Sequence, residues 1–218
     1  MGCKLQVALD FASMDDALRV ARAVSPSVDI MEAGTPLIKS VGLDVVRRLR
    51  EEFPGKLVVA DMKSTDVGAF EADLAFQAGA DFTVASGVTT LATIREVQKE
   101  ADRWDRRCIV DLTGVDDVVA RCKELSHFGV NLVLVHRSID EEVTGGSAWT
   151  EEECAMVGEL CALGLDVMTA GGLGEATIPL FCDYPLYAIV VGREITSSED
   201  PAVAAERLAQ LIGSQWPD

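Results

Sequence analysis

Eight short apolar runs, separated by segments of helical periodicity, constrain the fold of this 218-residue chain more than any other feature of its sequence. The runs have the length and β-branched content of buried parallel strands, and they read KLQVALD, VDIMEAG, KLVVAD, DFTVAS, RCIVDL, NLVLVH, LDVMTA and YAIVVG. Strict alternation of strand and helix predicts a parallel sheet with right-handed crossovers. Eight such units in a chain of this length favour closure of the sheet. The expected fold is therefore α/β, a single (β/α)8 TIM barrel over residues 1–218.

Helices are expected between these runs, most clearly over residues 69–78, 90–101, 116–127, 150–162 and 201–212. Two earlier helices are also expected, one starting at Ser13 and the other stopped by Pro54. The segment 175–181 contains Pro179 and predicts only a short helix. The alternative fold, an open doubly wound sheet, would need a glycine-rich phosphate loop after the first strand, where this chain has Asp10-Phe11-Ala12-Ser13.

The charge balance argues against a nucleic-acid partner. The sequence holds 36 acidic and 19 basic residues, which gives a formal net charge of −17. Such a charge repels nucleic acid unless a local basic patch exists. The basic clusters at Arg47-Arg48 and within residues 103–107 are mixed with acidic or apolar residues, as on solvated helix faces.

The six cysteines are scattered and lack the CxxC spacing of a metal site. Several lie in apolar segments, which indicates buried free thiols in a reducing compartment. The first strand begins almost at the first residue, which leaves no room for a signal peptide, and no apolar run reaches the length of a membrane span. We therefore expect a cytoplasmic protein without a membrane partner.

Ionisable residues and glycines gather where the strands are expected to end. In a barrel the carboxyl ends of all strands meet at one mouth, where barrel enzymes carry their active sites. A set so rich in acids, with one lysine, one histidine and late glycines, favours a functional site over solvated surface. The residues are Asp10, Glu32, Asp61, Lys63, Ser86, Asp111, His136, Ala170, Gly171, Gly172, Gly192 and Arg193.

The stretch LVVADMKSTDVG, residues 57–68, is the densest part of this set. Side chains alternate along a strand, so Asp61 and Lys63 are expected to point the same way, with Asp66 just beyond the strand. Two carboxylates would then flank one ammonium. A structural ion-pair cluster is one interpretation; we favour a catalytic site, because an ammonium fixed in this way stabilises a developing oxyanion.

Glu32 and Asp61 end consecutive strands and could share one hard divalent cation, because two carboxylates with water and substrate oxygens are typical magnesium ligation. A helix cap is the alternative for Glu32. His136 follows the run LVLV, where an imidazole at a barrel mouth suits proton transfer; a histidine packed under a loop is the alternative. His127 lies near a helix end and is assigned no role.

Glycines follow the last two expected strands, as AGG at residues 170–172 and VGR at residues 191–193. Glycine lets backbone N–H groups approach an anion, and a neighbouring arginine adds charge, so the two loops predict a phosphate site. Simple tight turns are the alternative. The presence of both loops together with Arg193 favours phosphate binding.

Together these motifs resemble the orotidine 5′-monophosphate decarboxylase superfamily, whose shared mark is DxKxxD on the third barrel strand. The resemblance runs through LQVALD, VDIMEAGTPLIK, VVADMKSTDVG, AFQAGAD, VHRSID, AGG and VGR, and so covers nearly the whole chain. It is greatest to the branch that holds 3-hexulose-6-phosphate synthase and 3-keto-L-gulonate 6-phosphate decarboxylase. That branch carries a magnesium-binding Glu at the position of Glu32, where the orotidine enzymes carry Lys and need no metal.

Within the branch the resemblance divides. Asp111, Ile139 and Ala170 are similar to the synthases, since the decarboxylases have Glu, Arg and Thr there. His136-Arg137-Ser138, Ala148-Trp149 and Arg193 are similar to the decarboxylases. The loop 139–149 is expected to cover the site and set specificity. We therefore expect a Mg²⁺-dependent 3-hexulose-6-phosphate synthase, with the decarboxylase as the alternative and a non-catalytic sugar-phosphate-binding barrel as a third possibility.

The resemblance also implies roles for individual residues. The branch shares a 1,2-enediolate of a pentulose 5-phosphate held on Mg²⁺, which implies Glu32 and Asp61 as ligands and Lys63 as a donor to the enediolate. His136 is then the base that removes a C1 proton from D-ribulose 5-phosphate, with Asp111 also catalytic. The last Asp of the motif reaches into the partner's site, so Asp66 implies a homodimer. Substrate binding is assigned to Asp10, Ala170, Gly171, Gly172, Gly192 and Arg193.

Overall fold

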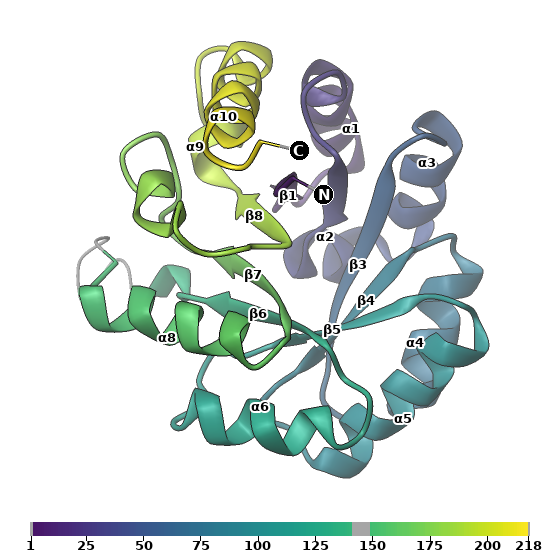
Figure 1. Ribbon diagram of the computed structural model, residues 1–218. Coiled ribbons are helices and arrows are strands. Elements are labelled where there is room, and N and C mark those ends of the chain that lie inside the picture. Colours follow the sequence, from purple (N-terminus) through teal and green to yellow (C-terminus); the bar gives the residue numbers. More distant parts are fainter. Residues whose placement is uncertain (1, 141–148, 218) are drawn as a thin grey trace.

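The computed structural model describes residues 2–140 and 149–217, and in it the eight expected strands form a closed parallel barrel (Figure 1). The strands are β1 (Lys4–Leu9), β2 (Ile30–Ala33), β3 (Leu57–Ser64), β4 (Phe82–Ser86), β5 (Arg107–Asp111), β6 (Leu132–His136), β7 (Asp166–Ala170) and β8 (Ala188–Val191). Strand β1 pairs with both β2 and β8, so that Gln6 lies beside Ile30 on one side and Val190 on the other. The predicted (β/α)8 barrel is confirmed.

Helices surround the barrel and connect successive strands (Figure 1). Those of the described residues are α1 (Met14–Val24), α2 (Thr35–Val41), α3 (Asp44–Glu52), α4 (Gly68–Gln77), α5 (Leu91–Arg103), α6 (Val118–Ser126), α8 (Glu151–Ala162), the 3₁₀ helix η1 (Ile178–Phe181), α9 (Arg193–Thr196) and α10 (Pro201–Gln215). Helix α1 starts where its sequence predicts, because the hydroxyl of Ser13 accepts a hydrogen bond from the Asp16 amide at 3.3 Å. None of the described helices is long and apolar enough to cross a membrane.

The short helices α2 and α9 are not predicted from the sequence, because seven and four residues are too few to show a helical period. The segment around Pro179 forms a single 3₁₀ turn, in which the proline ring occupies a first-turn position that needs no N–H donor. Helix α2 matters for function, because it follows β2 after one residue and brings Thr35 to Asp61 of β3.

Side chains alternate between two apolar layers. Residues facing outward pack against the helices and form the larger core, whereas residues facing inward fill the barrel. The inner layer contains Ile30, Val59, Phe82, Val84, Ile109, Leu132, Leu134, Met168, Ala170, Ala188 and Val190. Gln6 is only 1% exposed and lies on β1 opposite Ile30 and Val190 of this layer. A buried amide among apolar side chains needs a specific partner, and Gln6 has one in the site described next.

Candidate active site

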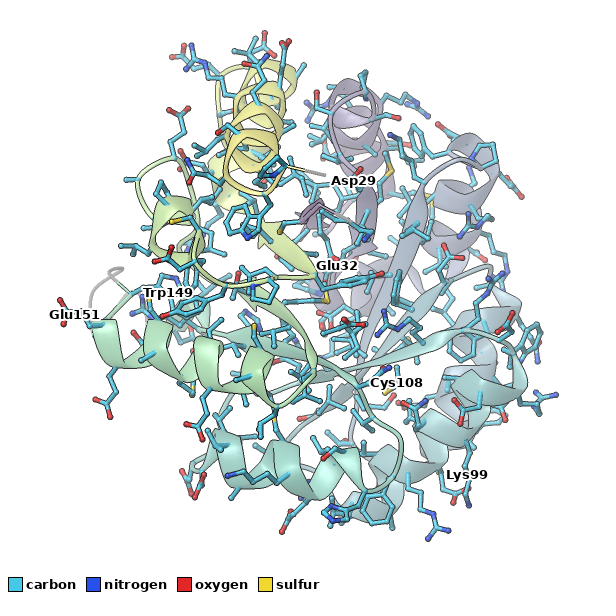
Figure 2. The ribbon with its side chains drawn as sticks, in the orientation of Figure 1. Asp29, Glu32, Lys99, Cys108, Trp149 and Glu151 are labelled. Atoms are coloured by element: carbon cyan, nitrogen blue, oxygen red, sulfur yellow. The ribbon has the colours of Figure 1, made fainter. Side chains whose placement is uncertain are left out.

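A cavity of about 1080 Å³ lies at the carboxyl ends of the strands. Figure 2 shows Glu32 inside the ring of strands and Lys99 on the outer side of the helices. The strand-end residues predicted from the sequence share this cavity. Its walls include Asp10, Glu32, Asp61, Lys63, Ser86, Asp111, His136, Ala170, Gly171, Gly172, Gly192 and Arg193.

Lys63 sits between two carboxylates, as the sequence predicts, but the second one comes from a different strand. Its Nζ lies 3.4 Å from Oδ1 of Asp61 and forms a short hydrogen bond to Oδ2 of Asp111 on β5. Burial alone would lower the pKa of Lys63, but the charges of Asp61 and Asp111 outweigh it and raise that pKa above its usual range. Lys63 is therefore a fixed ammonium at neutral pH.

Asp66 does not occupy the place beside Lys63. Its side chain is exposed, lies outside the residues that line the cavity, and accepts a hydrogen bond from the Val67 amide at 2.8 Å. The expectation that Asp61 and Asp66 flank the ammonium within one chain is therefore wrong, and Asp111 takes that place. The chain turns away from the barrel after Ser64, which carries Asp66 outward.

The backbone of β3 explains how Lys63 reaches Asp111. The register between β3 and β4 shifts between Ala60 and Ser64, and Lys63 has a positive φ of 46°. A bulge re-aims a side chain, and a positive φ at a non-glycine residue is backbone strain of the kind found at functional sites. The irregularity lies at the residue that carries the ammonium, which supports a functional role for Lys63.

Asp111 connects the lysine to the histidine. Its Oδ2 lies 3.0 Å from Nδ1 of His136, and its Oδ1 accepts hydrogen bonds from the amide and hydroxyl of Thr113 at 2.9 and 2.6 Å. Burial would raise the pKa of Asp111, but its bonds to His136 and Lys63 and their charges hold that pKa well below its usual range. A carboxylate can only accept, so Nδ1 of a neutral His136 carries the proton and Nε2 is left as the base.

Glu32 is buried, and its Oε2 accepts a hydrogen bond from Nε2 of Gln6 at 2.7 Å. Burial raises the pKa of Glu32 well above its usual value, and the charges of Asp61 and Asp10 raise it further. Three carboxylates close enough to disturb one another favour binding of a positive charge between them.

Asp61 is held by helix α2. The hydroxyl of Thr35 lies 2.6 Å from its Oδ2, and the amide of Thr35 lies 3.3 Å from the same atom. Oδ1 of Asp61 is buried and lies 3.4 Å from Nζ of Lys63, but it accepts no hydrogen bond from the described residues. Within those residues no group of three His, Cys, Asp or Glu side chains is arranged to enclose a metal by itself. Two carboxylates with an unsatisfied oxygen therefore fit a Mg²⁺ ion that takes its other ligands from water and substrate.

The opposite wall of the cavity is built from glycine loops. Gly171 and Gly172 have positive φ values of 98° and 61°, and a Cβ at Gly171 would lie 2.3 Å from the carbonyl oxygen of Arg137. The indole of Trp149 donates to the carbonyl of Gly171 at 2.8 Å and packs edge-on against Phe181. These loops and Arg193 line the same cavity, and glycine N–H groups together with an arginine suit a phosphate.

Several site residues are missed by the sequence analysis. Gln6 interrupts an apolar run and is a detectable signal, because a polar residue in a buried strand needs a partner. Thr35 and Thr113 each follow a strand that ends in an acidic or small residue, and nothing in their spacing marks them. Residues 141–148, which form most of the loop expected to set specificity and include Ala148, lie outside the described residues.

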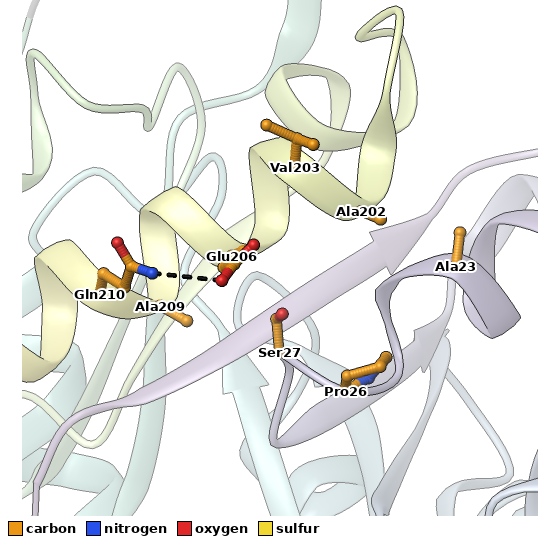
Figure 3. Close-up of a pocket in the computed structure, with 8 residues that line it drawn as sticks. All are labelled: Ala23, Pro26, Ser27, Ala202, Val203, Glu206, Ala209 and Gln210. Carbon is orange, nitrogen blue, oxygen red and sulfur yellow. Dashed lines mark hydrogen bonds between the residues drawn. The ribbon is translucent and has the colours of Figure 1, made fainter.

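A second hollow, of about 640 Å³, lies on the outer wall between α10 and the end of α1 (Figure 3). Small side chains such as Ala23, Ala202 and Ala209 line it, and Glu206 accepts a hydrogen bond from Gln210 at 3.3 Å. Among the described residues that line it, Glu206 alone is charged. This hollow therefore lacks the converging polar groups of a catalytic site.

Acid–base groups gathered at the carboxyl ends of a closed parallel barrel place the chain among the (β/α)8-barrel enzymes. Within that class it belongs to the orotidine 5′-phosphate decarboxylase / HUMPS family, whose model matches residues 3–208.

Individual relatives are similar over almost the whole chain. A 3-hexulose-6-phosphate synthase of Methylomonas aminofaciens is 37% identical over 206 residues, covering 94% of this chain and 97% of that protein. A 3-keto-L-gulonate-6-phosphate decarboxylase of Escherichia coli is 34% identical, covering 97% and 96%. A crystal structure of KGPDC from Streptococcus mutans superposes with a TM-score of 0.94 at 31% identity, covering 98% and 99%.

Proposed function

We propose that this protein is a Mg²⁺-dependent 3-hexulose-6-phosphate synthase, an aldehyde-lyase that joins D-ribulose 5-phosphate and formaldehyde. The observation that carries the proposal is the chain of contacts from Lys63 through Asp111 to His136 in one cavity. It supplies a fixed cation and an oriented base, the two groups that formation of an enediolate needs. Similarity to named synthases at 37 and 38% identity supports the same activity.

The reaction begins with proton transfer. Nε2 of His136 takes a proton from C1 of ribulose 5-phosphate, and the electron pair of the broken C–H bond passes into the 1,2-enediolate. Lys63 donates a hydrogen bond to the developing oxyanion. C1 of the enediolate then attacks the carbonyl carbon of formaldehyde, so that the new C–C bond forms as the C2 carbonyl is restored and the C=O π electrons pass to the aldehyde oxygen. The imidazolium of His136 returns its proton to that oxygen, which gives the hydroxyl of the product and the neutral base.

Glu32 and Asp61 would hold the Mg²⁺ ion. When bound, the ion supplies positive charge that lowers the energy of negative charge on the substrate oxygens. Among the described residues, Oδ1 of Asp61 accepts no hydrogen bond and Glu32 is bonded by the neutral amide of Gln6, which supports a cation between these two carboxylates.

The substrate is oriented by the remaining walls. The glycine loops at Gly171, Gly172 and Gly192, together with Arg193, would bind the phosphate. Asp10 and Ala170 line the same cavity and would contact the sugar chain. Gly34 leaves room for Asp10, because a Cβ at Gly34 would lie 2.0 Å from Oδ1 of Asp10.

A cytoplasmic homodimer, with Asp66 contributed across the interface, is part of the proposal. Val67, Phe70 and Val88 are 59, 65 and 59% exposed, and the hydroxyl of Thr89 reaches the carbonyl of Thr65 at 2.5 Å, which joins the two segments that carry them. Apolar side chains exposed beside Asp66 suit a contact between two copies. Phe70→Lys should give monomers in sedimentation experiments with little activity, and full activity of those monomers would remove Asp66 from the partner's site.

The alternative activity is decarboxylation of 3-keto-L-gulonate 6-phosphate, a carboxy-lyase reaction through the same kind of enediolate. Arg137 and Ser138 beside His136 line the cavity and favour it. Ile139 and Ala170 also line the cavity and favour the synthase, since Ile139 offers no donor for the protonation that follows loss of CO₂.

One assay separates these activities. Purified protein with Mg²⁺ is given ribulose 5-phosphate and formaldehyde in one reaction and 3-keto-L-gulonate 6-phosphate in another, and formaldehyde consumption and CO₂ release are followed. We expect formaldehyde consumption to dominate. No formaldehyde consumption would overturn the synthase assignment, and no turnover of either substrate would favour a non-catalytic sugar-phosphate-binding barrel.

A further inference from the structure

The two carboxylates assigned to the cation share one structural feature. In each, one carboxylate oxygen accepts a hydrogen bond from an uncharged side chain. Oε2 of Glu32 accepts from Gln6 at 2.7 Å, and Oδ2 of Asp61 accepts from Thr35 at 2.6 Å. The described residues give no hydrogen bond to the other oxygen of either carboxylate. Oδ1 of Asp61 has the ammonium of Lys63 at 3.4 Å as an ion-pair neighbour. Each carboxylate is therefore fixed by hydrogen bonds to one oxygen, while its second oxygen accepts none from the described residues.

The burial of Gln6 has no explanation in the fold alone. The side chain is 1% exposed, it lies inside the barrel beside Ile30 and Val190, and its Oε1 is buried without a hydrogen-bond partner in the described residues. An unpaired buried amide oxygen is destabilising, and an apolar residue would fill the position at lower cost. The bond from Nε2 to Glu32 is what an apolar residue could not supply.

Thr35 holds Asp61 through two of its own atoms. Its hydroxyl and amide both lie within reach of Oδ2, at 2.6 and 3.3 Å, and the hydroxyl also lies 3.0 Å from the backbone oxygen of Asp61. Thr35 is the first residue of α2, so the helix fixes its backbone. The carboxylate of Asp61 cannot rotate its second oxygen away from the cavity without breaking these hydrogen bonds.

We propose that Gln6 and Thr35 are positioning residues for the divalent cation: by tying one oxygen of Glu32 and one of Asp61, they hold the two remaining oxygens ready for the ion. Both donors are uncharged, so they orient the carboxylates without neutralising them. The inference rests on the proposed function in one respect, that the cation binds at Glu32 and Asp61.

The test measures cation binding directly and without substrate. Mn²⁺ is titrated into wild-type protein and variants, and free Mn²⁺ is followed by electron paramagnetic resonance. Thr35→Val removes the hydroxyl and Thr35→Ser restores it, whereas Gln6→Met removes the amide at similar volume. Thr83→Val is the matched control, because Thr83 carries a fully buried hydroxyl without a partner in the described residues, on β4 between the inner-layer residues Phe82 and Val84.

We expect Thr35→Val and Gln6→Met to weaken Mn²⁺ binding about tenfold or more, as loss of such orienting bonds does elsewhere. Thr35→Ser and Thr83→Val should bind as the wild type does. Thermal unfolding confirms that each variant is folded, and Gln6→Met carries the test alone if Thr35→Val does not fold.

The outcomes separate this inference from the proposed function. Wild-type affinity in Thr35→Val and Gln6→Met would overturn the positioning role and leave the cation site intact. Equal weakening in Thr83→Val would overturn it too, because any buried hydroxyl would then have the same effect. A wild-type protein that binds no Mn²⁺ would overturn both the inference and the metal assignment of Glu32 and Asp61.

Discussion

Asp111 and His136 lie on adjacent strands, with Oδ2 of the carboxylate 3.0 Å from Nδ1 of the imidazole. Because Asp111 stays ionised, this contact fixes the proton of a neutral His136 on Nδ1 and leaves Nε2 as the acceptor. The same carboxylate oxygen bonds to Lys63. One buried carboxylate thus fixes the tautomer of His136 and the position of the Lys63 ammonium, the two groups that act on the substrate.

Replacing Asp111 by Asn should therefore reduce proton transfer. An asparagine amide can donate to Nδ1, which would move the imidazole proton to Nε2 and remove the base. We expect the exchange of the C1 proton of ribulose 5-phosphate in D₂O, followed by NMR without formaldehyde, to slow by about 10²–10⁴-fold. His127→Gln is the control, since His127 is exposed on the helix side and should exchange normally. An unchanged rate in Asp111→Asn would contradict the assignment.

Removal of the ammonium tests catalysis against simple binding. In Lys63→Ala, Asp61 and Asp111 lose their shared cation and the oxyanion loses its donor, so turnover should fall below detection. Calorimetric binding of ribulose 5-phosphate should remain measurable, because the glycine loops and Arg193 lie on another wall. Unchanged turnover would remove Lys63 from the mechanism.

The sequence predicts the barrel and its mouth because both depend on local pattern. A short run of apolar residues defines each strand, and the parallel arrangement of the strands brings Glu32, Asp61 and His136 together. The sequence does not predict the partner of Lys63. That contact joins residues 48 positions apart and depends on the bulge in β3, which forms only when β3 pairs with β4.

The sequence pattern likewise does not predict which residues bond to the carboxylates of Glu32 and Asp61. Thr35 acts through helix α2, whose seven residues are too few to show a period. Gln6 is visible as a polar residue in an apolar run, but its partner Glu32 is 26 residues away and is set by the β1–β2 register. Contacts between strands require the register, which the sequence pattern leaves open.

Ile139 offers a test of specificity. It lines the cavity and is 47% exposed, so Ile139→Arg should fit without disturbing the core. A guanidinium there adds a donor for protonation of the enediolate and should raise decarboxylation of 3-keto-L-gulonate 6-phosphate about tenfold, the effect of one charge-assisted hydrogen bond of about 1.5 kcal/mol. Val203→Arg, exposed on α10 away from the site, should change neither activity. No gain in CO₂ release would show that Ile139 does not restrict the reaction.

Gly171 tests the conformation of the phosphate loop. With φ at 98° and the Arg137 carbonyl 2.3 Å from an added Cβ, Gly171→Ala should lower the free energy of unfolding by about 1–3 kcal/mol and raise KM for ribulose 5-phosphate. The control is Gly213→Ala in α10, where no atom lies within 4 Å of the added Cβ. That variant should gain about 0.5–1 kcal/mol. Urea unfolding of both variants measures whether the free energy of unfolding falls in Gly171→Ala and rises in Gly213→Ala. Equal changes in the two variants would contradict a strained backbone at Gly171.

The thiol of Cys108 predicts how stability depends on alkaline pH. Burial raises its pKa from 9.0 to about 12. Between those values the unfolded chain loses this proton while the folded chain keeps it, so the free energy of unfolding falls as pH rises, by up to about 1.4 kcal/mol per pH unit. Cys108→Ala lacks this contribution.

The difference in unfolding free energy between wild type and Cys108→Ala should consequently be largest below pH 9 and shrink as the pH approaches 12. Urea titrations at several pH values measure it. The same burial should protect Cys108 from iodoacetamide at pH 9 while exposed Cys182 reacts, which mass spectrometry of the labelled peptides would show. A difference that stays constant with pH, or equal labelling of the two thiols, would mean that Cys108 is open to solvent in the folded protein.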